Sequence, residues 1–188
     1  MTNKLGLYIH IPFCLRKCRY CDFLSFDDRS VYIGRYIGEL KKELADNSEE
    51  YSYYETETVY IGGGTPSVLT HGTVGELLDL IKSLYTVRDD AEISIELNPG
   101  SADADKLSEY REHGVNRLSM GFCTGNRDEF ELLGRYGRYD LINESAGLLQ
   151  AYGFENFSID ILLGLPGQTL ETWEYTLQRC LKIKPAHI

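Results

Sequence analysis

The sequence lacks any apolar run long enough to cross a bilayer, since a membrane-spanning helix needs about 20 such residues in succession. Its amino-terminal residues also lack the apolar core and small-residue cleavage site of a secretory signal. Basic side chains are too few to balance the acidic ones: 19 Lys and Arg stand against 29 Asp and Glu, giving a net charge of −10. This balance argues against nucleic acid or an anionic membrane as the main partner, because both carry negative charge themselves. We therefore expect a cytoplasmic protein without a membrane span.

Cysteine is also scarce, with five residues, and no second Cys-x-x-Cys pair follows the first. That absence argues against a closed structural zinc site, which usually takes its four ligands from two such pairs. Cys14, Cys18 and Cys21 fall within eight residues, directly after the apolar run 7–13. A turn this short cannot bury three thiols separately, so we expect their sulfurs to converge on one thiophilic group. Three thiolates fit a [4Fe–4S] cluster whose fourth iron takes a small molecule; reduced structural cysteines or an incidental zinc site are the alternative.

Strand-like apolar segments alternate with amphipathic helical segments along the whole chain. Strands are expected at 5–11, 58–61, 92–97, 117–122 and 157–163, and helices at about 28–45, 73–84, 103–113, 126–134, 139–152 and 170–183. The order predicts an α/β fold, a parallel sheet with right-handed crossovers that forms an incomplete (βα)6 barrel. Residues 185–188 have the pattern of the first residues of a sixth strand.

Two helix details follow from local patterns. Thr73 and Glu76 have the spacing of a capping box, which predicts the start of the second long helix. The last helix is expected to bury one apolar face, made of Leu170, Trp173, Leu177, Cys180 and Leu181. On that face Cys180 is expected to be chemically inert.

Three of the strands carry glycine or carboxylate residues near their carboxyl ends. Gly62 to Gly64 follow the second strand and remove every Cβ from the path of the backbone, so a polar ligand can lie against its amide groups. Glu96 ends the third strand, where it is either a solvated charge or a partner for an ammonium group or ribose hydroxyls. Asp160 lies within the apolar fifth strand, where a carboxylate needs an ion partner or a polar cavity. In barrel-like α/β folds such strand ends meet at one face, where sites are built.

Together these features resemble the radical S-adenosylmethionine (SAM) superfamily, whose signature is C-x3-C-x2-C. Within it the sequence is similar to the oxygen-independent coproporphyrinogen III oxidase family, through residues 8–14, 20–23, 62–67, 96–99, 114–119, 160 and 164–169. The resemblance implies that Cys14, Cys18 and Cys21 hold a [4Fe–4S] cluster. It further implies SAM binding by Tyr8, Tyr20, Gly63, Gly64, Thr65, Glu96, Arg135 and Asp160, and it assigns no residue a certain catalytic role.

Two positions depart from the pattern of this family. Relatives have Gly-Val-Gln where this sequence has Gly121-Phe122-Cys123, and a thiol cannot offer both the donor and the acceptor of an amide. Cys123 is therefore either a small apolar filler or a functional thiol near the cluster. True oxidases carry a further cysteine two positions after the third one, where this sequence has Phe23, so the chain looks more like the haem chaperone, oxidase-like branch.

The resemblance implies a cluster- and SAM-binding protein of haem or porphyrin metabolism, with porphyrin or haem as a further ligand and an electron donor of the flavodoxin or ferredoxin type. Oxidation of coproporphyrinogen III is one alternative, and an inactive product is another. The relatives are about twice as long, so residues 1–188 are interpreted as a truncated radical SAM core domain without the carboxyl-terminal region that meets porphyrin. His10, His71 and His113 are candidate haem ligands, but none is a convincing axial ligand and an ordinary core or surface role is favoured for each.

Overall fold

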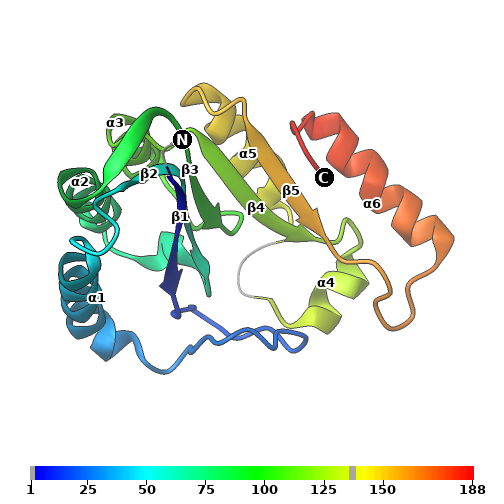
Figure 1. The fold of residues 1–188 in the computed structure, drawn as a ribbon. Helices are drawn as coiled ribbons and strands as arrows, with labels where there is room; N and C mark the ends of the chain where they lie inside the picture. The colour runs from blue at the N-terminus through cyan, green and yellow to red at the C-terminus, as the bar shows by residue number, and fades with distance from the viewer. Residues whose placement is uncertain (1–2, 136–138) are drawn as a thin grey trace.

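The computed structural model describes residues 3–135 and 139–188 (Figure 1). Its single sheet contains β1 (Asn3–Ile11), β2 (Tyr54–Gly63), β3 (Thr86–Leu97), β4 (Arg117–Cys123) and β5 (Phe157–Ile161), all parallel and in sequence order. The helices are α1 (Ile33–Asn47), α2 (Thr73–Leu84), α3 (Ala104–Glu112), α4 (Arg127–Leu133), α5 (Leu141–Ala151) and α6 (Leu170–Ile183), with short 3-10 helices η1 (Ser30–Tyr32) and η2 (Pro66–Val68). The predicted α/β fold and its partial barrel of five β–α units are confirmed.

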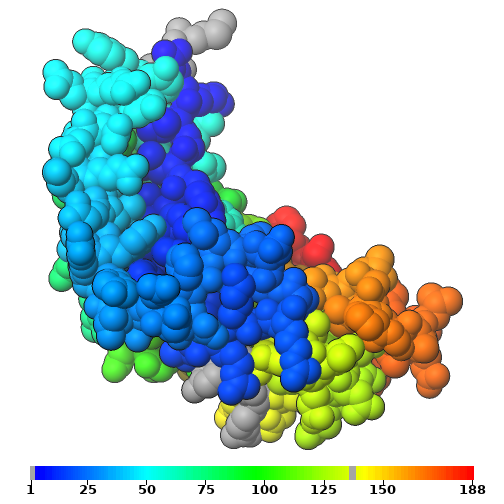
Figure 2. All heavy atoms as spheres, turned by 90° about the horizontal axis from the view of Figure 1, so that it is seen from below, coloured from blue at the N-terminus to red at the C-terminus, as the bar shows by residue number. Residues whose placement is uncertain are grey.

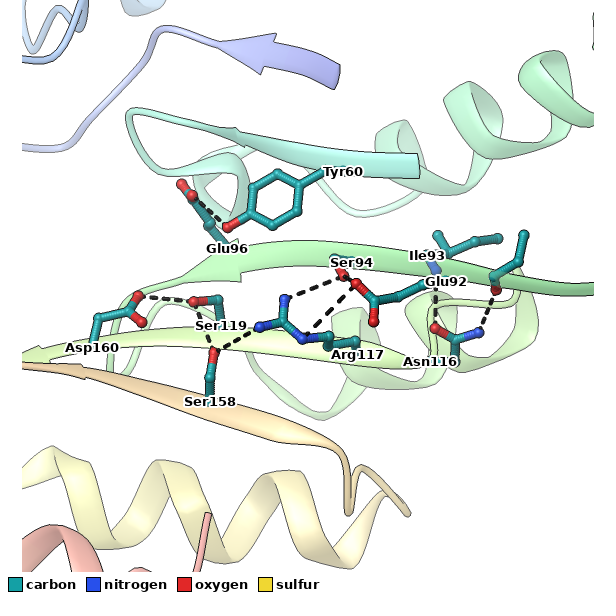
Figure 3. Close-up of polar contacts among 11 residues, drawn as sticks. Tyr60, Glu92, Ile93, Ser94, Glu96, Asn116, Arg117, Ser119, Ser158 and Asp160 are labelled. Carbon is teal, nitrogen blue, oxygen red and sulfur yellow. Dashed lines mark hydrogen bonds and ion pairs between the residues drawn. The ribbon is translucent and has the colours of Figure 1, made fainter. Parts of the chain in front are cut away.

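The helices cover the outer side of a curved sheet (Figure 1). Side chains of a strand alternate between the two faces of its sheet, and here the alternation separates an apolar face from a polar one. The apolar side chains Ile61, Ile95, Leu118 and Ile159 are fully buried in the core between sheet and helices. The residues that alternate with them face the concave side and are polar: Tyr60, Ser94, Glu96, Ser119, Ser158 and Asp160 (Figure 3).

The capping box predicted for Thr73 and Glu76 does not form. The N-cap of α2 is Gly72, with φ 90°, and glycine has no side-chain acceptor that could cap the helix. The buried carboxylate of Glu109 on α3 accepts hydrogen bonds from the Gly72 and Gly75 amides, both at 2.7 Å. A charged acceptor supplied by a neighbouring helix therefore takes the place of the local cap.

The predicted buried face of α6 is wrong at both ends, because Leu170 and Leu181 are 77% and 63% exposed. Thr176, Cys180 and Ile183 are buried instead. Thr176 accepts a hydrogen bond from the Gly125 amide at 2.9 Å, which satisfies this polar side chain within the buried stripe of the helix.

The expected first residues of a sixth strand are present as an isolated parallel bridge between His187 and Ser158. The Ile159 amide donates to the His187 carbonyl at 3.1 Å, and the Ala186 amide to the Phe157 carbonyl at 2.9 Å. β5 ends at Ile161, two residues before the expected end. No helix within residues 3–135 and 139–188 has both the length and the apolar character needed to cross a membrane.

Candidate functional site

The cysteine loop follows β1 and carries Cys14, Cys18 and Cys21, all half-buried free thiols. The Cys14 amide donates to the Phe26 carbonyl at 2.9 Å, and the Arg19 amide to the Leu133 carbonyl at the end of α4 at 3.0 Å. Burial raises the pKa of the Cys18 thiol above its usual value, and Cys21 and Cys14 add to this rise while Arg135 opposes it. The loop therefore extends from the end of β1 to the carboxyl end of α4, with Cys18 within electrostatic reach of Cys14 and Cys21.

The three sulfurs do not converge on one point as the sequence led us to expect. Within the residues that the structure describes, no group of three His, Cys, Asp or Glu side chains is arranged to hold a metal ion. Uncharged thiols have little attraction for one another, and the ordering of thiolate ligands is coupled to metal binding itself. The donor set is of the right chemistry for an iron–sulfur cluster, which is held by cysteine thiolates.

The glycine turn after β2 packs directly against this loop. Gly63 has φ 121°, a conformation that residues with a side chain rarely adopt. A Cβ on Gly64 would lie 2.7 Å from the Phe13 carbonyl oxygen and 3.0 Å from the Cys14 sulfur. The Thr65 amide donates to the Phe13 carbonyl at 2.8 Å, and its hydroxyl to the Cys14 sulfur at 3.6 Å. Glycine is therefore required here so that the turn can approach the first cysteine.

Glu96 ends β3 beside this turn (Figure 3). Its carboxylate accepts hydrogen bonds from the Tyr60 hydroxyl at 2.8 Å and from the Gly63 amide at 3.0 Å. The Tyr60 ring stacks on Tyr8, with centroids 6.0 Å apart. Burial and the neighbouring Glu96 raise the pKa of Tyr60, so its hydroxyl stays protonated and donating. Glu96 is thus a structural partner of the glycine turn and not a free strand-end charge.

Arg135 is 8% exposed and contacts residues that follow β3 and lie within β4. Its Nη2 donates to Asn98 Oδ1 at 2.7 Å and to the Gly121 carbonyl at 2.8 Å. Asn98 Nδ2 in turn donates to Thr65 Oγ1 at 3.0 Å. Sequence reasoning did not single out Asn98 as a site residue, although it lies two positions after Glu96 in the segment that carries the family resemblance. A chain of hydrogen bonds therefore runs from Arg135 to the turn beside Cys14.

Cys123 is buried, but its sulfur has polar neighbours and is more than an apolar filler. Arg135 Nη1 donates a hydrogen bond to this sulfur, and the Tyr20 hydroxyl lies 3.1 Å from it. Burial alone would lower the pKa of Arg135, but Cys123, Tyr20 and Cys18 raise it above its ordinary value. The backbone of Cys123 has φ 70°. The two residues on either side of it are joined by a hydrogen bond, in which the Thr124 amide donates to the Phe122 carbonyl at 3.0 Å. This is the geometry of a strained three-residue turn.

Asp160 lies on the concave face of the sheet, where its carboxylate accepts a hydrogen bond from the Ser119 hydroxyl at 2.8 Å (Figure 3). Ser158 donates to Ser119 at 3.1 Å, and Arg117 donates to Ser158 at 3.4 Å. The strand therefore tolerates Asp160 because it faces a polar surface and bonds to a hydroxyl.

The candidate haem ligands are engaged with other groups. His10 Nε2 lies 2.9 Å from the Leu24 carbonyl oxygen, and His113 Nδ1 lies 2.8 Å from Asp79. His71 is 3.8 Å from Glu109. Cys180 is buried in the core, and burial raises its pKa to about 11, as an inert thiol requires.

A cavity of about 420 Å³ lies between the cysteine loop, the glycine turn and Arg135. Cys18, Thr65, Asn98 and Arg135 contribute to its lining, together with the backbone of Gly100. The structure therefore gathers one predicted cluster ligand, Cys18, and two predicted SAM residues, Thr65 and Arg135, around one cavity. Glu96 and Asp160 lie along the adjoining concave face (Figure 3).

Comparison with known proteins agrees with this geometry. Residues 8–180 match the model of the radical SAM superfamily. The heme chaperone HemW of Escherichia coli K12 is 37% identical, over 98% of this chain and 49% of the relative. HemW of Bacillus subtilis 168 is 36% identical, over 96% and 48%. The solved structure of coproporphyrinogen III oxidase HemN from Escherichia coli, described as a radical SAM enzyme, has a TM-score of 0.90 and 31% identity, over 98% of this chain and 42% of that one.

The chain spans about half the length of the curated relatives it matches. The match to the superfamily covers the cysteine loop, the glycine turn and every strand but the first residues of β1. The resemblance predicted from sequence is thereby confirmed. Membership of this family implies a [4Fe–4S] cluster and SAM as cofactors. The chain belongs to the radical SAM superfamily.

Proposed function

We propose that this chain binds a [4Fe–4S] cluster through Cys14, Cys18 and Cys21 and binds SAM in the adjoining cavity, as a haem chaperone-like protein of haem or porphyrin metabolism. The observation that carries the proposal is the chain of hydrogen bonds from Arg135 through Asn98 to Thr65, whose hydroxyl contacts the Cys14 sulfur. These contacts place a buried cation beside the cysteine loop. A nucleotide that carries a carboxylate needs such a partner.

Different residues of the chain would bind different parts of SAM. The glycine turn at Gly63 and Gly64 would present backbone groups to its methionine end, and Glu96 holds that turn in place through the Gly63 amide at 3.0 Å. Arg135 is already held by neutral acceptors, so its charge is free to attract an anionic group. Tyr8 and Tyr20 would flank the ligand, and Asp160 would accept hydrogen bonds from it. When bound, the cluster and SAM supply radical chemistry, while the protein positions them and excludes water.

The haem-related part of the proposal rests on relatives. The named HemW relatives support a haem chaperone, and Phe23 occupies the position of the extra cysteine expected in true oxidases. The likeness to HemN, with a TM-score of 0.90, favours a second candidate, oxidation of coproporphyrinogen III. The two candidate functions can be told apart by their products, because an oxidase must cleave SAM and consume coproporphyrinogen III.

Anaerobic reconstitution with iron and sulfide, followed by dithionite and SAM, tests the proposal. A chaperone-like protein will acquire an iron–sulfur cluster and take up haem, with little release of 5′-deoxyadenosine. Release of 5′-deoxyadenosine that depends on coproporphyrinogen III would instead establish the oxidase. A protein that acquires no cluster, or whose cluster spectrum does not respond to SAM, would refute both.

A further inference from the structure

Asp160 is the second-last residue of β5, and its side chain is exposed on the concave face of the sheet (Figure 3). Figure 2 shows the molecule from the side at which the strands end, and both the segment after β5, in orange, and the cysteine loop, in blue, lie on this side. The Ser119 hydroxyl donates to one oxygen of the carboxylate, Oδ2, at 2.8 Å. The other oxygen, Oδ1, accepts no hydrogen bond from the residues that the structure describes, so it is available to a ligand.

The position of Asp160 in the sheet brings it close to Arg135. Gly121 of β4 is the register partner of Asp160, and the Gly121 carbonyl accepts a hydrogen bond from Arg135 Nη2 at 2.8 Å. A Cβ on Gly121 would lie only 3.4 Å from the same nitrogen. The missing side chain therefore lets the guanidinium approach the sheet at the level of Asp160.

Ser119 is held in turn by a second serine and an arginine (Figure 3). The Ser158 hydroxyl donates to Ser119 Oγ at 3.1 Å, and Arg117 Nη2 donates to Ser158 Oγ at 3.4 Å. The two serines are paired in the register of β4 and β5, and each is 5% exposed. We call this row of Arg117, Ser158, Ser119 and Asp160 the serine bridge. Because its two hydroxyls are buried, water competes little for their hydrogen bonds.

The two ends of the serine bridge fix the direction of its hydrogen bonds. A guanidinium has only donors, so Ser158 must accept from Arg117. An ionised carboxylate has only acceptors, so Ser119 must donate to Asp160. Each serine therefore accepts from one neighbour and donates its single proton to the next. Hydrogen bonds that follow one another in this way polarise and strengthen each other where water is excluded.

The charge of Arg117 also acts on the concave face. Its Nε lies 4.0 Å from a carboxylate oxygen of Glu92, whose side chain is 48% exposed, and such a loose, solvated pair leaves much of the positive charge unscreened by the protein. Burial and the neighbouring Glu96 are the main causes that raise the pKa of Tyr60. Asp160 adds to this rise and Arg117 opposes it, so both charges reach the same part of the concave face.

We propose that Arg117 is a positioning residue for SAM, which acts through the serine bridge by holding Oδ2 of Asp160 so that Oδ1 is kept in place for the ligand. The inference rests on the proposed function, in which Asp160 accepts hydrogen bonds from SAM. A carboxylate that is held before the ligand arrives loses less conformational freedom on binding, and this preorganisation increases affinity. Arg117 lies at the start of β4 and Asp160 near the end of β5, so the arginine acts on the ligand through the two serines.

Calorimetric titration of the anaerobically reconstituted protein with SAM tests this assignment. Ser158→Ala interrupts the serine bridge without removing any direct partner of Asp160, and it should raise the Kd for SAM about fivefold. The matched control is Ser94→Ala. Ser94 is also buried and also accepts from Arg117 at 3.4 Å, but its hydroxyl donates to Glu92 at 3.1 Å. The Kd of Ser94→Ala should stay within about twofold of wild type.

Variants of Arg117 show whether the arginine acts through Asp160. Arg117→Met should raise the Kd for SAM about tenfold, and Arg117→Lys, which keeps a cation with donors only, should recover most of the affinity. When Asp160→Ala is already present, Arg117→Met should change Kd by less than about twofold, because no carboxylate is left to position. An arginine that only stabilises the sheet would cause the same loss in both backgrounds.

Equal effects of Ser158→Ala and Ser94→Ala would overturn the inference, as would an equal cost of Arg117→Met with and without Asp160. Either result leaves the proposed function intact, provided that the wild-type protein binds SAM. A wild-type protein that acquires a cluster but does not bind SAM would instead refute the proposed function, and the inference with it. Urea unfolding identifies variants that do not fold. If Arg117→Met is one of them, the two serine variants, which each lack a single oxygen atom, still decide the outcome.

Discussion

Nη1 of Arg135 donates a hydrogen bond to the sulfur of Cys123, where the sequence departs from the Gly-Val-Gln pattern of the family that it resembles. The guanidinium is 8% exposed, so each of its donors needs a partner within the protein. The sulfur supplies one, while Asn98 and the Gly121 carbonyl supply others at 2.7 and 2.8 Å. The thiol at this position therefore helps to orient a residue that the family resemblance assigns to SAM.

Cys123→Ala should lower the free energy of unfolding by about 1–3 kcal/mol, because a buried donor of Arg135 loses its acceptor. Cys123→Gly loses the same acceptor, but glycine relieves the backbone at φ 70° and should recover about 1 kcal/mol relative to alanine. Urea unfolding of the three proteins measures both differences. If alanine and glycine variants prove equally stable, the turn is not strained. If neither differs from wild type, the hydrogen bond contributes nothing.

Glu96→Gln should weaken SAM binding about tenfold or more, because a charged acceptor beside the glycine turn becomes a neutral amide. Tyr60→Phe is the matched control, since it removes the hydroxyl that donates to Glu96 at 2.8 Å and leaves the carboxylate in place. Its SAM affinity should stay within about threefold of wild type. Calorimetric titration of the two reconstituted variants with SAM measures this difference in affinity. A larger loss in Tyr60→Phe than in Glu96→Gln would show that Glu96 acts only on the fold.

Glu109→Ala should destabilise the protein by about 2 kcal/mol or more, because the Gly72 and Gly75 amides lose a buried charged acceptor. Thr73→Ala should cost less than about 0.5 kcal/mol, since Thr73 caps nothing and its hydroxyl meets only Thr70. Urea unfolding midpoints at neutral pH provide the comparison. The opposite ranking would mean that α2 begins with the local capping box after all.

The free energy of unfolding should fall as pH rises from about 9 to about 11, in part through Cys180, whose pKa is raised by burial to about 11 from an ordinary value of 9.0. Below this range both states keep the proton; within it the unfolded thiol ionises while the folded one does not, so stability is lost. A pKa difference of about two, at about 1.4 kcal/mol for each unit, limits the loss to about 3 kcal/mol.

Cys180→Ala measures this contribution, because the buried tyrosines titrate in the same alkaline range in both proteins. The fall in stability between pH 9 and 11 should be shallower in Cys180→Ala than in wild type. Identical slopes would show that the Cys180 thiol ionises as readily in the folded protein as in the unfolded one.

The sequence was sufficient to predict the elements whose signal is local. Apolar alternation located all five strands, although β2 and β3 begin earlier than expected, at Tyr54 and Thr86, because sheet pairing extends into polar segments. The helix expected at 126–134 does begin at Asn126, whose side chain caps α4 by accepting from the Asp128 and Glu129 amides. Gly63 and Gly64 occupy positions where an added Cβ would clash with neighbouring atoms, and the role of the turn in binding SAM stays a prediction.

What the sequence could not predict depends on contacts between distant segments. Glu129 lies in the first turn of α4, and its buried carboxylate accepts from the Thr172 hydroxyl of α6 at 2.6 Å. Glu109 caps a helix more than thirty residues earlier in the chain, and Asn98 bridges Arg135 and Thr65. Each contact satisfies a buried polar group across the fold, and no spacing rule along the chain can locate such a partner.

Electron paramagnetic resonance of the anaerobically reconstituted, dithionite-reduced protein, with and without SAM, tests the central claim most directly. A [4Fe–4S] signal that changes when SAM is added, and that disappears when Cys14, Cys18 and Cys21 are all replaced by alanine, is the predicted result. A protein that carries zinc or no metal, or that keeps its iron after all three replacements, would contradict the account.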